Sequence, residues 1–183
     1  MILSLDKLIH NCKINDAKAQ SELYKLFSSK LFATCLKYSR NHVEAEDNLQ
    51  DAFITIFKKI GQYKNKGSFE GWLKRVTINT ALQCYRTQGV FDIVNEDLIE
   101  DQAITIEDED NISIDYLLQI IQELPDRYRL VFNLYVMDGY SHQDVAEMLK
   151  ITTGTSKSNL ARARHILKDK ITEYKTRLHS QSL

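Results

Sequence analysis

An internal stretch without positive charge divides this chain into two basic segments. Residues 89–112 contain nine Asp and Glu residues and no Lys or Arg, and they show no sustained helical or strand period. Residues 1–88 contain 14 Lys and Arg against eight Asp and Glu, and residues 113–183 contain ten against eight. The net charge of −1 is therefore the sum over two basic segments and one acidic segment that joins them. We expect two small domains, at 1–88 and 113–183, and a flexible linker at 89–112 that is extended or disordered in the free protein.

The spacing of apolar residues predicts helices in both basic segments. The chain has one proline and six glycines, and it has few of the alternating β-branched runs that favour strands. Helical spacing covers residues 4–14, 43–60, 70–86, 116–124 and 127–136, and it covers 17–40 with a break near Ser28 and Ser29. Pro125 ends one of these helices, and Asp126 is the expected cap of the next. The predicted fold class is all-α.

Residues 140–168 have the pattern of two short helices separated by a tight turn. Ser141 and Asp144 have capping-box spacing, and Thr152 is placed to cap the second helix. At about 100° per residue, one face of that helix carries small and apolar side chains. This face consists of Ser156, Leu160, Ala163, Leu167 and Ile171. The opposite face consists of Thr155, Ser158, Arg162 and His165, with Asn159 and Ala161 on the flanks.

A helix pair whose second member has a polar outer face is typical of a helix-turn-helix that enters the major groove of DNA. A basic amphipathic helix on the surface of an all-helical protein has the same pattern. Residues 140–168 by themselves leave both interpretations open.

An acidic and amide patch is predicted on the helix at 43–60. Glu46, Asp47, Gln50 and Asp51 lie on one face of this helix, in a segment that is otherwise basic. The patch is either a solvated helix face or a docking surface for a basic partner.

A basic loop between aromatic residues precedes the helix at 70–86. The loop contains Lys64, Asn65, Lys66 and Ser68, and the aromatic residues around it are Tyr63, Phe69 and Trp72. Such a combination can hold phosphates and stack on unpaired bases. The alternative is that the aromatic residues belong to the core, which is the interpretation we favour for Trp72.

The sequence has no motif for catalysis, metal binding or membrane insertion. It lacks a glycine-rich phosphate loop, GxSxG and HExxH, and its five His residues are scattered. Cys12, Cys35 and Cys84 have neither CxxC spacing nor a His partner, which favours reduced thiols in a cytoplasm. No apolar run reaches the ~18 residues of a membrane span, and the start has no basic leader with a cleavage site. We expect a cytoplasmic protein that is not an enzyme and uses no cofactor or metal.

Both basic segments resemble bacterial RNA polymerase sigma factors of the extracytoplasmic-function class, which consist of sigma domains 2 and 4 joined by a linker. In the second segment the matching residues are Leu124-Pro125-Asp126-Arg127, Gly139-Tyr140-Ser141, Val145-Ala146, Gly154-Thr155, Lys157-Ser158 and Arg162-Ala163-Arg164. In the first segment they are Ala45-Glu46-Asp47, Gln50-Asp51-Ala52-Phe53, Ser68-Phe69, Trp72-Leu73, Arg75 and Asn79. The resemblance extends over residues 15–86 and 113–170, which is most of the chain.

The resemblance implies a dissociable polymerase subunit that directs promoter-specific initiation. It assigns Asp47, Gln50 and Asp51 to the clamp coiled coil of the largest polymerase subunit, and it makes the polymerase flap and promoter DNA further partners. A flipped base of the −10 element would be captured by Lys64, Asn65, Lys66, Ser68, Phe69, Trp72, Arg75 and Asn79. The −35 element would be read by Thr155, Lys157, Ser158, Asn159, Arg162 and His165. Within this set Lys157 would hold phosphate, and Ser158 and Arg162 would reach base edges.

The resemblance also implies properties of the free protein. The acidic linker would lie in the basic RNA-exit path of the polymerase, and an anti-sigma factor is an expected partner because sequestration is common in this family. Asn159 replaces a frequent Arg, and Ile78 and Gln83 replace a common Arg and Asp. Ser156 replaces an apolar residue, so we expect the second helix of the pair to pack less firmly. We expect a monomer that binds duplex DNA weakly without polymerase.

Two other interpretations fit parts of the sequence. A stand-alone helix-turn-helix regulator with an unrelated N-terminal domain would bind a palindromic duplex by itself. It leaves the patch of Gln50 and Asp51 and the loop before Phe69 without a role. A helical adaptor that binds only proteins leaves Ser158 and Arg162 without one.

Overall fold

The computed structural model describes residues 4–91 and 112–181, with only the backbone for residues 178–181. The chain divides into two compact units, one ending at Thr87 and the other beginning at Gln88. Every regular element in the described ranges is a helix, so the predicted all-α class is confirmed. Most of the predicted linker, residues 92–111, lies outside the described residues.

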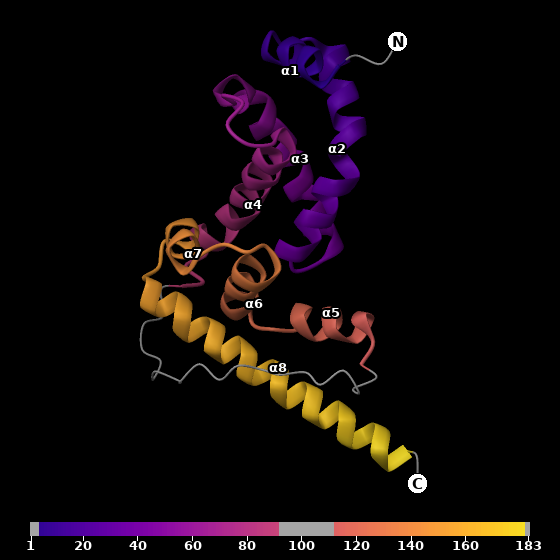
Figure 1. The fold of residues 1–183 in the computed structure, drawn as a ribbon, viewed down its shortest axis with the longest axis vertical. Helices are drawn as coiled ribbons and strands as arrows, with labels where there is room; N and C mark the ends of the chain where they lie inside the picture. The colour runs from indigo at the N-terminus through magenta and orange to yellow at the C-terminus, as the bar shows by residue number, and fades with distance from the viewer. Residues whose placement is uncertain (1–3, 92–111, 182–183) are drawn as a thin grey trace. The chain divides into compact units, whose positions relative to one another are not determined.

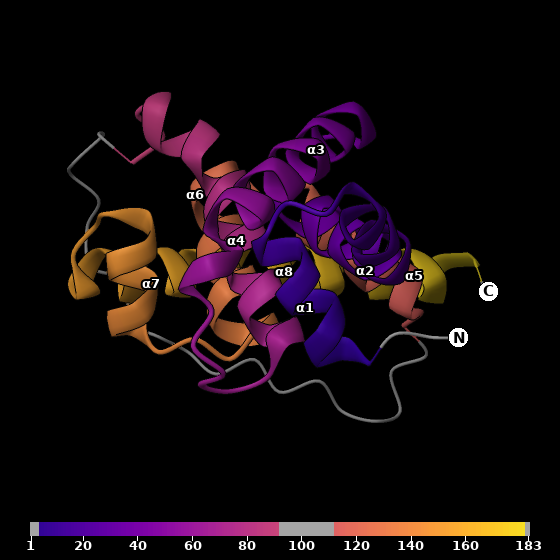
Figure 2. The ribbon, with the colours of Figure 1, turned by 90° about the horizontal axis from the view of Figure 1, so that it is seen from above.

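Three long helices that pack against one another form the first domain (Figure 1). They are α2 (Ala17–Tyr38), α3 (His42–Lys59) and α4 (Phe69–Thr87). The short α1 (Leu5–Lys13) packs against α2 and against η1 (Ile60–Gln62), a 3-10 turn that follows α3 (Figure 2). The core that these helices share includes Leu8, Leu23, Leu31, Leu49, Ile56 and Leu73. One end of α4 and the loop before it are held in place by this core.

α2 continues unbroken through Ser28 and Ser29, so the predicted break there is wrong. Ser29 is exposed, whereas Phe27 and Leu31 on either side of the pair are buried in one core. The helix propensity of serine is only a few tenths of a kcal/mol below that of good helix formers, at most about 0.7 kcal/mol per residue. Packing of the apolar stripe on both sides of the pair outweighs this weak preference.

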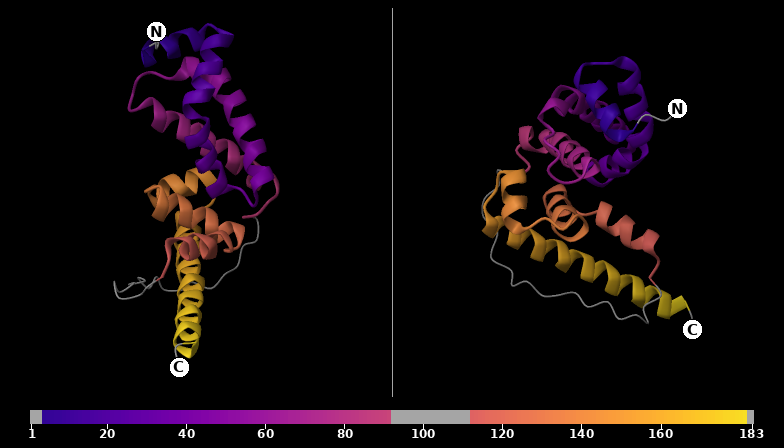
Figure 3. Two further views of the ribbon diagram at one scale, coloured as in Figure 1. Left: turned by 90° about the vertical axis from the view of Figure 1, so that its right-hand side faces the viewer. Right: turned by 45° about the horizontal axis from the view of Figure 1, so that its top comes forward.

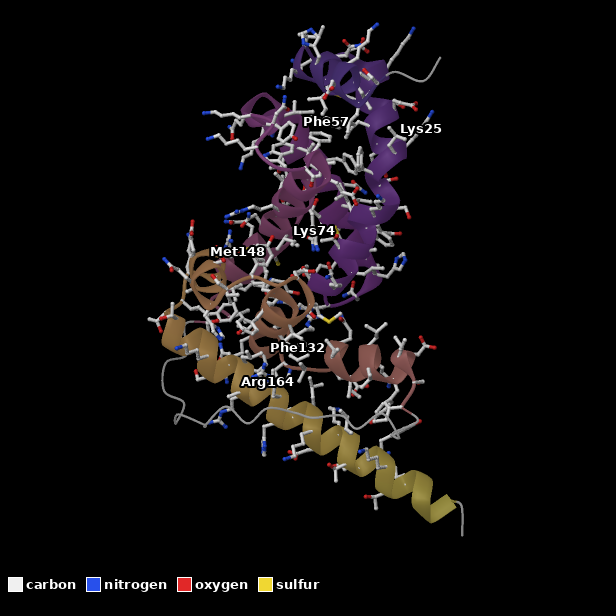
Figure 4. All side chains as sticks on the ribbon, in the orientation of Figure 1. Lys25, Phe57, Lys74, Phe132, Met148 and Arg164 are labelled. Atoms are coloured by element: carbon white, nitrogen blue, oxygen red, sulfur yellow. The ribbon has the colours of Figure 1, made fainter. Side chains whose placement is uncertain are left out.

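The second domain is assembled along α8 (Thr153–Gln181), its longest helix (Figure 3). Three shorter helices contact it: α5 (Ile114–Gln122), α6 (Asp126–Phe132) and α7 (His142–Leu149). A π-helical turn, η2 (Asn133–Met137), continues α6 and contacts α7. The buried side chains include Leu130, Val131, Leu134, Val145, Leu149, Leu160, Ala163 and Leu167. Many of the side chains that point outward from both domains end in nitrogen or oxygen atoms (Figure 4).

Asp126 does not cap α6, contrary to the sequence prediction. The N-cap residue is Pro125, which makes no side-chain capping bond, and Asp126 is the first helical residue. Its Oδ1 instead accepts a hydrogen bond of 2.7 Å from Arg129 Nη2. Arg129 is only 1% exposed. Asp126 therefore supplies the countercharge that a buried guanidinium requires.

α5 is fastened to the middle of α8 by three polar and aromatic contacts. The rings of Tyr116 and Tyr174 stack with centroids 4.0 Å apart, and the Tyr116 hydroxyl donates to the carbonyl of Lys170 at 3.1 Å. Lys170 Nζ lies 2.7 Å from Glu123 Oε2. These contacts hold α5 against a part of α8 that lies beyond the helix-turn-helix.

Candidate nucleic-acid and protein interfaces

α7 and α8 form the helix-turn-helix that the sequence predicts. Ser141 caps α7 through a full capping box with Asp144, and Lys150 ends the helix with a left-handed φ of 58°. The backbone N–H of Thr155 donates to Thr152 Oγ1 at 3.0 Å, which caps the start of α8. Both predicted caps are confirmed. They fix the lengths of the two helices and the position of the turn between them.

The two helices are joined by a hydrogen bond between His142 and Ser156. His142 Nδ1 lies 2.9 Å from Ser156 Oγ, and Ser156 is fully buried. The imidazole of His142 also stacks on Tyr135 of η2, with ring centroids 4.2 Å apart. The buried hydroxyl at this core position therefore has a partner, and His142 connects η2, α7 and α8.

The outer face of α8 presents most of the side chains that the sequence assigns to it. Lys157 and His165 are exposed, and Thr155, Ser158 and Arg162 are partly exposed. The Ser158 hydroxyl donates to the carbonyl of Thr155 at 3.1 Å, and His165 Nε2 lies 3.5 Å from Asp169 Oδ2. These side chains form one polar strip over the first turns of α8.

Asn159 does not belong to this strip. Its side chain is only 3% exposed, whereas the sequence prediction places Asn159 among the residues that contact DNA. Helical spacing placed it on the flank of α8, and the packed neighbours of α8 cover both flanks, because Ala161 is buried as well. The buried sector of this helix is therefore wider than the apolar residues alone indicate.

An exposed acidic patch lies on α3. Asp47, Gln50 and Asp51 are all exposed, as the sequence predicts. Val43 and Ile54 share this stripe of the helix and are 66% and 51% exposed. Neither residue belongs to the predicted patch, although their spacing of four and three residues from Asp47 and Asp51 was a usable signal. A partner that is both basic and apolar fits this surface.

The basic loop before α4 has a defined, tightly turned backbone. Lys64, Asn65, Lys66 and Ser68 are exposed on it. Asn65 and Gly67 have φ values of 56° and 79°, in the left-handed region that Asn tolerates and Gly favours. Ser68 Oγ accepts a hydrogen bond of 3.0 Å from the backbone N–H of Gly71, which caps α4. The loop therefore presents two lysines and an amide on a short protrusion.

Phe69 is part of the core and not of this exposed loop. It is 4% exposed, and its ring lies 5.0 Å from that of Tyr63, 5.8 Å from that of Trp72 and 5.8 Å from that of Phe27. The structure thus differs from the sequence prediction, in which Phe69 belongs to the residues that contact the −10 element. Trp72 is partly buried against the same core, which is the interpretation favoured for it, but one side of it borders a cavity.

This cavity, of about 560 Å³, lies along α4 and is closed on the other side by α3 and η1. Its walls are formed by Thr55, Lys59, Gln62, Trp72, Arg75, Val76, Asn79, Thr80, Gln83 and Arg86. They include three cationic side chains and no carboxylate. The volume exceeds that of one nucleobase, and the charge suits phosphate. Of these residues, Trp72, Arg75 and Asn79 belong to the predicted −10 contact set; the others do not, although positions 72, 75, 79, 83 and 86 follow helical spacing.

Arg86 organises the far wall of the cavity. Its Nη2 donates to Asn79 Oδ1 at 3.3 Å and its Nη1 to Gln83 Oε1 at 3.2 Å. Asn79 Nδ2 donates in turn to the carbonyl of Arg75 at 3.0 Å, which fixes the orientation of the amide. Burial lowers the pKa of Arg86, because desolvation disfavours its charged form. Arginine nevertheless stays protonated in proteins, so the wall keeps its positive charge.

The described parts of the chain offer little for other kinds of site. Within residues 4–91 and 112–181 there is no group of three or more His, Cys, Asp or Glu placed to hold a metal ion. No helix in these same ranges is long and apolar enough to cross a membrane.

Two family models match the chain, one in each domain. The model described as sigma-70 region 2 matches residues 23–90 and includes the α3 patch and the cavity. The model described as sigma-70, region 4 matches residues 114–167 and includes the polar strip of α8. Neither includes α1 or the end of α8.

Curated proteins and solved structures match over most of the chain. The chain is 28% identical over 189 residues to the ECF RNA polymerase sigma factor SigW of Bacillus subtilis, covering 93% of this chain and 98% of that protein. It is 27% identical over 179 residues to the ECF RNA polymerase sigma-E factor of Haemophilus influenzae, covering 90% and 93%. The sigma factor RpoE of Bartonella quintana, solved with the anti-sigma factor NepR, shares the fold with a TM-score of 0.53 and 23% identity, covering 84% of this chain and 96% of that one.

Proposed function

Because this chain belongs to the sigma-70 family of RNA polymerase sigma factors, in the extracytoplasmic-function class, we propose that it binds core polymerase and directs initiation at promoters with its own −35 and −10 elements. It acts in the cytoplasm and carries out no chemistry itself. The observation that carries the proposal is the pairing of the acidic α3 patch with the cation-lined cavity in one domain. A stand-alone regulator has no use for either.

The α3 patch is the contact to the polymerase. Asp47, Gln50 and Asp51 supply acceptors for cationic side chains of the clamp coiled coil, and Val43 and Ile54 supply apolar area beside them. Charge complementarity speeds association and selects the partner, while the apolar contacts are desolvated on binding. We propose that the flap of the polymerase contacts the second domain, as the family resemblance implies.

The loop and the cavity of the first domain take the separated non-template strand at the −10 element. The exposed loop residues Lys64, Asn65 and Lys66 contact the phosphates, and the cavity receives an unstacked base. Unstacking a base costs a few kcal/mol, so contacts with the extruded base make melting depend on sequence. Arg75 and Asn79 lie on the wall where the base edge would lie. Trp72 offers its open side for stacking.

The polar strip of α8 reads the −35 element in the major groove. Lys157 contacts a phosphate, and Ser158 and Arg162 reach base edges, with Arg162 able to make a bidentate contact to guanine. Thr155 and His165 flank them on the same strip. We also propose that an anti-sigma factor binds this protein, in line with the complex of the similarly folded Bartonella quintana sigma factor with NepR.

Run-off transcription with bacterial core polymerase on a pool of promoter fragments tests the function. We expect transcripts only when the protein is added, from templates that share one −35 and −10 pair. Asp51→Arg is the matched inactive protein, and it should give no transcripts while remaining folded. No initiation, together with tight binding of the free protein to a palindrome, would show a stand-alone regulator instead.

A further inference from the structure

Tyr63 closes the basic loop on itself. It follows η1 directly, is 8% exposed, and donates a hydrogen bond of 2.9 Å from its hydroxyl to the carbonyl of Gly67. Its ring lies 5.0 Å from that of Phe69 and 5.7 Å from that of Trp72. The core therefore holds the ring, and the hydroxyl holds the far end of the loop.

Both ends of the loop are fixed before any DNA is present. Tyr63 and Gly67 define one closed span, and the cap formed by Ser68 and Gly71 defines the start of α4. Between them Asn65 adopts a left-handed backbone conformation, which turns the chain sharply. Ordering a loop at the moment of binding weakens affinity, and a loop that is already ordered avoids this loss.

Lys13 contacts the backbone of Tyr63. Its Nζ donates to the carbonyl of Tyr63 at 3.3 Å. α1, which ends at Lys13, is anchored by the buried side chains of Leu8, Ile9 and Cys12 and packs against η1. Because the region 2 model begins at residue 23, this contact comes from a part of the chain outside the family match.

We propose that Tyr63 is a positioning residue for the basic loop in its contact with the −10 element, and that Lys13 of α1 supports Tyr63. This inference rests on the proposed function of the first domain. Neither residue contacts DNA. Tyr63 sets the shape in which Lys64, Asn65 and Lys66 meet the displaced strand, so it acts on capture of single-stranded −10 DNA and not on the −35 or polymerase contacts.

The main test measures holoenzyme, formed from the full chain and core polymerase, against two DNA probes. One is the fluorescent non-template single strand across the −10 element of the template selected by transcription, and the other is duplex −35 DNA. Tyr63→Phe keeps the buried ring and removes only the hydroxyl. We expect about three- to ten-fold weaker binding of the single strand, the loss expected for one hydrogen bond. Binding of the −35 duplex and of core polymerase should not change.

Two matched controls separate positioning from general stability. Tyr24→Phe removes the hydroxyl of a half-exposed tyrosine on α2 and should leave both affinities unchanged. Lys13→Gln should weaken single-strand binding less than Tyr63→Phe, Lys13→Arg should preserve it, and Lys7→Gln on the same helix should have no effect. Equal losses on both probes would make Tyr63 a stability residue and overturn the proposal.

Hydrogen exchange in the free protein gives a readout that needs neither DNA nor polymerase. The amides of Gly71 and Trp72 donate to Ser68 at the end of the loop, at 3.0 and 3.1 Å. Tyr63→Phe should speed their exchange while the α3 amides and the later α4 amides keep their protection. Unchanged exchange of these two amides would overturn the proposal. If the wild-type protein directs no transcription, both the proposed function and this inference are refuted. If the wild-type protein is active but Tyr63→Phe binds the single strand as tightly as wild type, only this inference is refuted.

Discussion

The imidazole Nδ1 of His142 lies 2.9 Å from the hydroxyl of Ser156, and this contact joins the first helix of the helix-turn-helix to the second. A serine at a fully buried position would weaken packing if its hydroxyl had no partner. With the partner, the same position gains a directional contact between two helices. The structure thus replaces the expectation of looser packing at Ser156 with a specific hydrogen bond.

Loss of the His142–Ser156 hydrogen bond should loosen the helix-turn-helix. We expect Ser156→Ala and His142→Phe each to lower the local stability of α7 and α8, with a coupling energy of about 0.5–1.5 kcal/mol in the double-mutant cycle. Phe keeps the stacking on Tyr135 and removes the nitrogen. Hydrogen exchange of the α7 and α8 amides measures the effect, since the single tryptophan, Trp72, lies in the other domain. Additive effects of the two variants would show that the bond contributes nothing.

Reversal of charge on the α3 patch should abolish binding to core polymerase. Asp51→Arg places a cation on an exposed face that we propose meets cations of the clamp, so like charges would repel. Native gel shift or co-purification with core polymerase measures the loss. Glu22→Arg on the exposed surface of α2 carries the same charge change and should bind normally. If Asp51→Arg still bound core polymerase, the α3 patch would not be the polymerase contact.

Truncation of Arg162 should relax specificity at one base pair of the −35 element. We expect Arg162→Ala to cost about 1–3 kcal/mol there, because the bidentate contact to guanine is lost. Arg162→Lys keeps the charge without the planar fork and should restore overall affinity more than specificity. Transcription from a library of −35 variants measures both, with Arg177→Ala further along α8 as the control. A uniform loss over all variants would make Arg162 a phosphate contact.

A carboxylate introduced at Gln83 should weaken capture of the −10 strand. Gln83 Oε1 accepts from Arg86 at 3.2 Å, so Gln83→Glu forms an ion pair that cancels one of the three cavity cations. We expect weaker binding of the −10 single strand by holoenzyme, with a salt slope smaller by about 0.7. Gln20→Glu, outside the cavity, is the matched control. A slope equal to that of wild type would show that Arg86 does not face phosphate.

Much of the architecture could be predicted from the sequence, because the caps and the apolar spacing of most helices match the way those helices pack in the structure. Ser141, Asp144 and Thr152 mark helix ends through bonds to their own backbone neighbours, which depend on spacing alone. The acidic stripe of α3 follows from helical period in the same way. Cap positions and exposed stripes are properties of one helix, so no tertiary information is needed to find them.

The differences between the sequence prediction and the structure concern side chains whose environment is set by another part of the chain. Phe69 is adjacent to the basic loop in sequence, yet the rings of Phe27 in α2, Tyr63 after η1 and Trp72 in α4 enclose it. Asn159 is buried because packing covers both flanks of α8. Arg86 belongs to the cavity only because α3 and η1 supply the opposite wall. Helical spacing predicts on which face of its helix each of these residues lies, but it does not predict which other element packs against that face.

The contact between α5 and α8 should weaken in acid. Hydrogen bonds from Lys170 and Gln119 hold the pKa of Glu123 below its ordinary value. A carboxyl whose pKa is lowered by folding adds stability above its unfolded pKa, near 4.3, and loses it as the pH falls through the folded value. Protonation would remove the partner of Lys170 Nζ at 2.7 Å and release one of the contacts that hold α5. We expect faster exchange of the α5 amides below about pH 4, after correction for the intrinsic pH dependence of exchange.

Glu123→Gln should remove this acid-dependent step, because the neutral amide has no proton to gain. Its α5 amides should exchange faster than those of wild type at neutral pH and show the same relative protection in acid. Glu173→Gln, an exposed carboxylate on α8, serves as the control and should keep the wild-type profile. An acid-dependent step that persists in Glu123→Gln would assign the effect to another carboxylate of the second domain. The stacking of Tyr116 on Tyr174 does not involve the Glu123 carboxylate, so α5 should stay docked through that contact even when Glu123 is protonated.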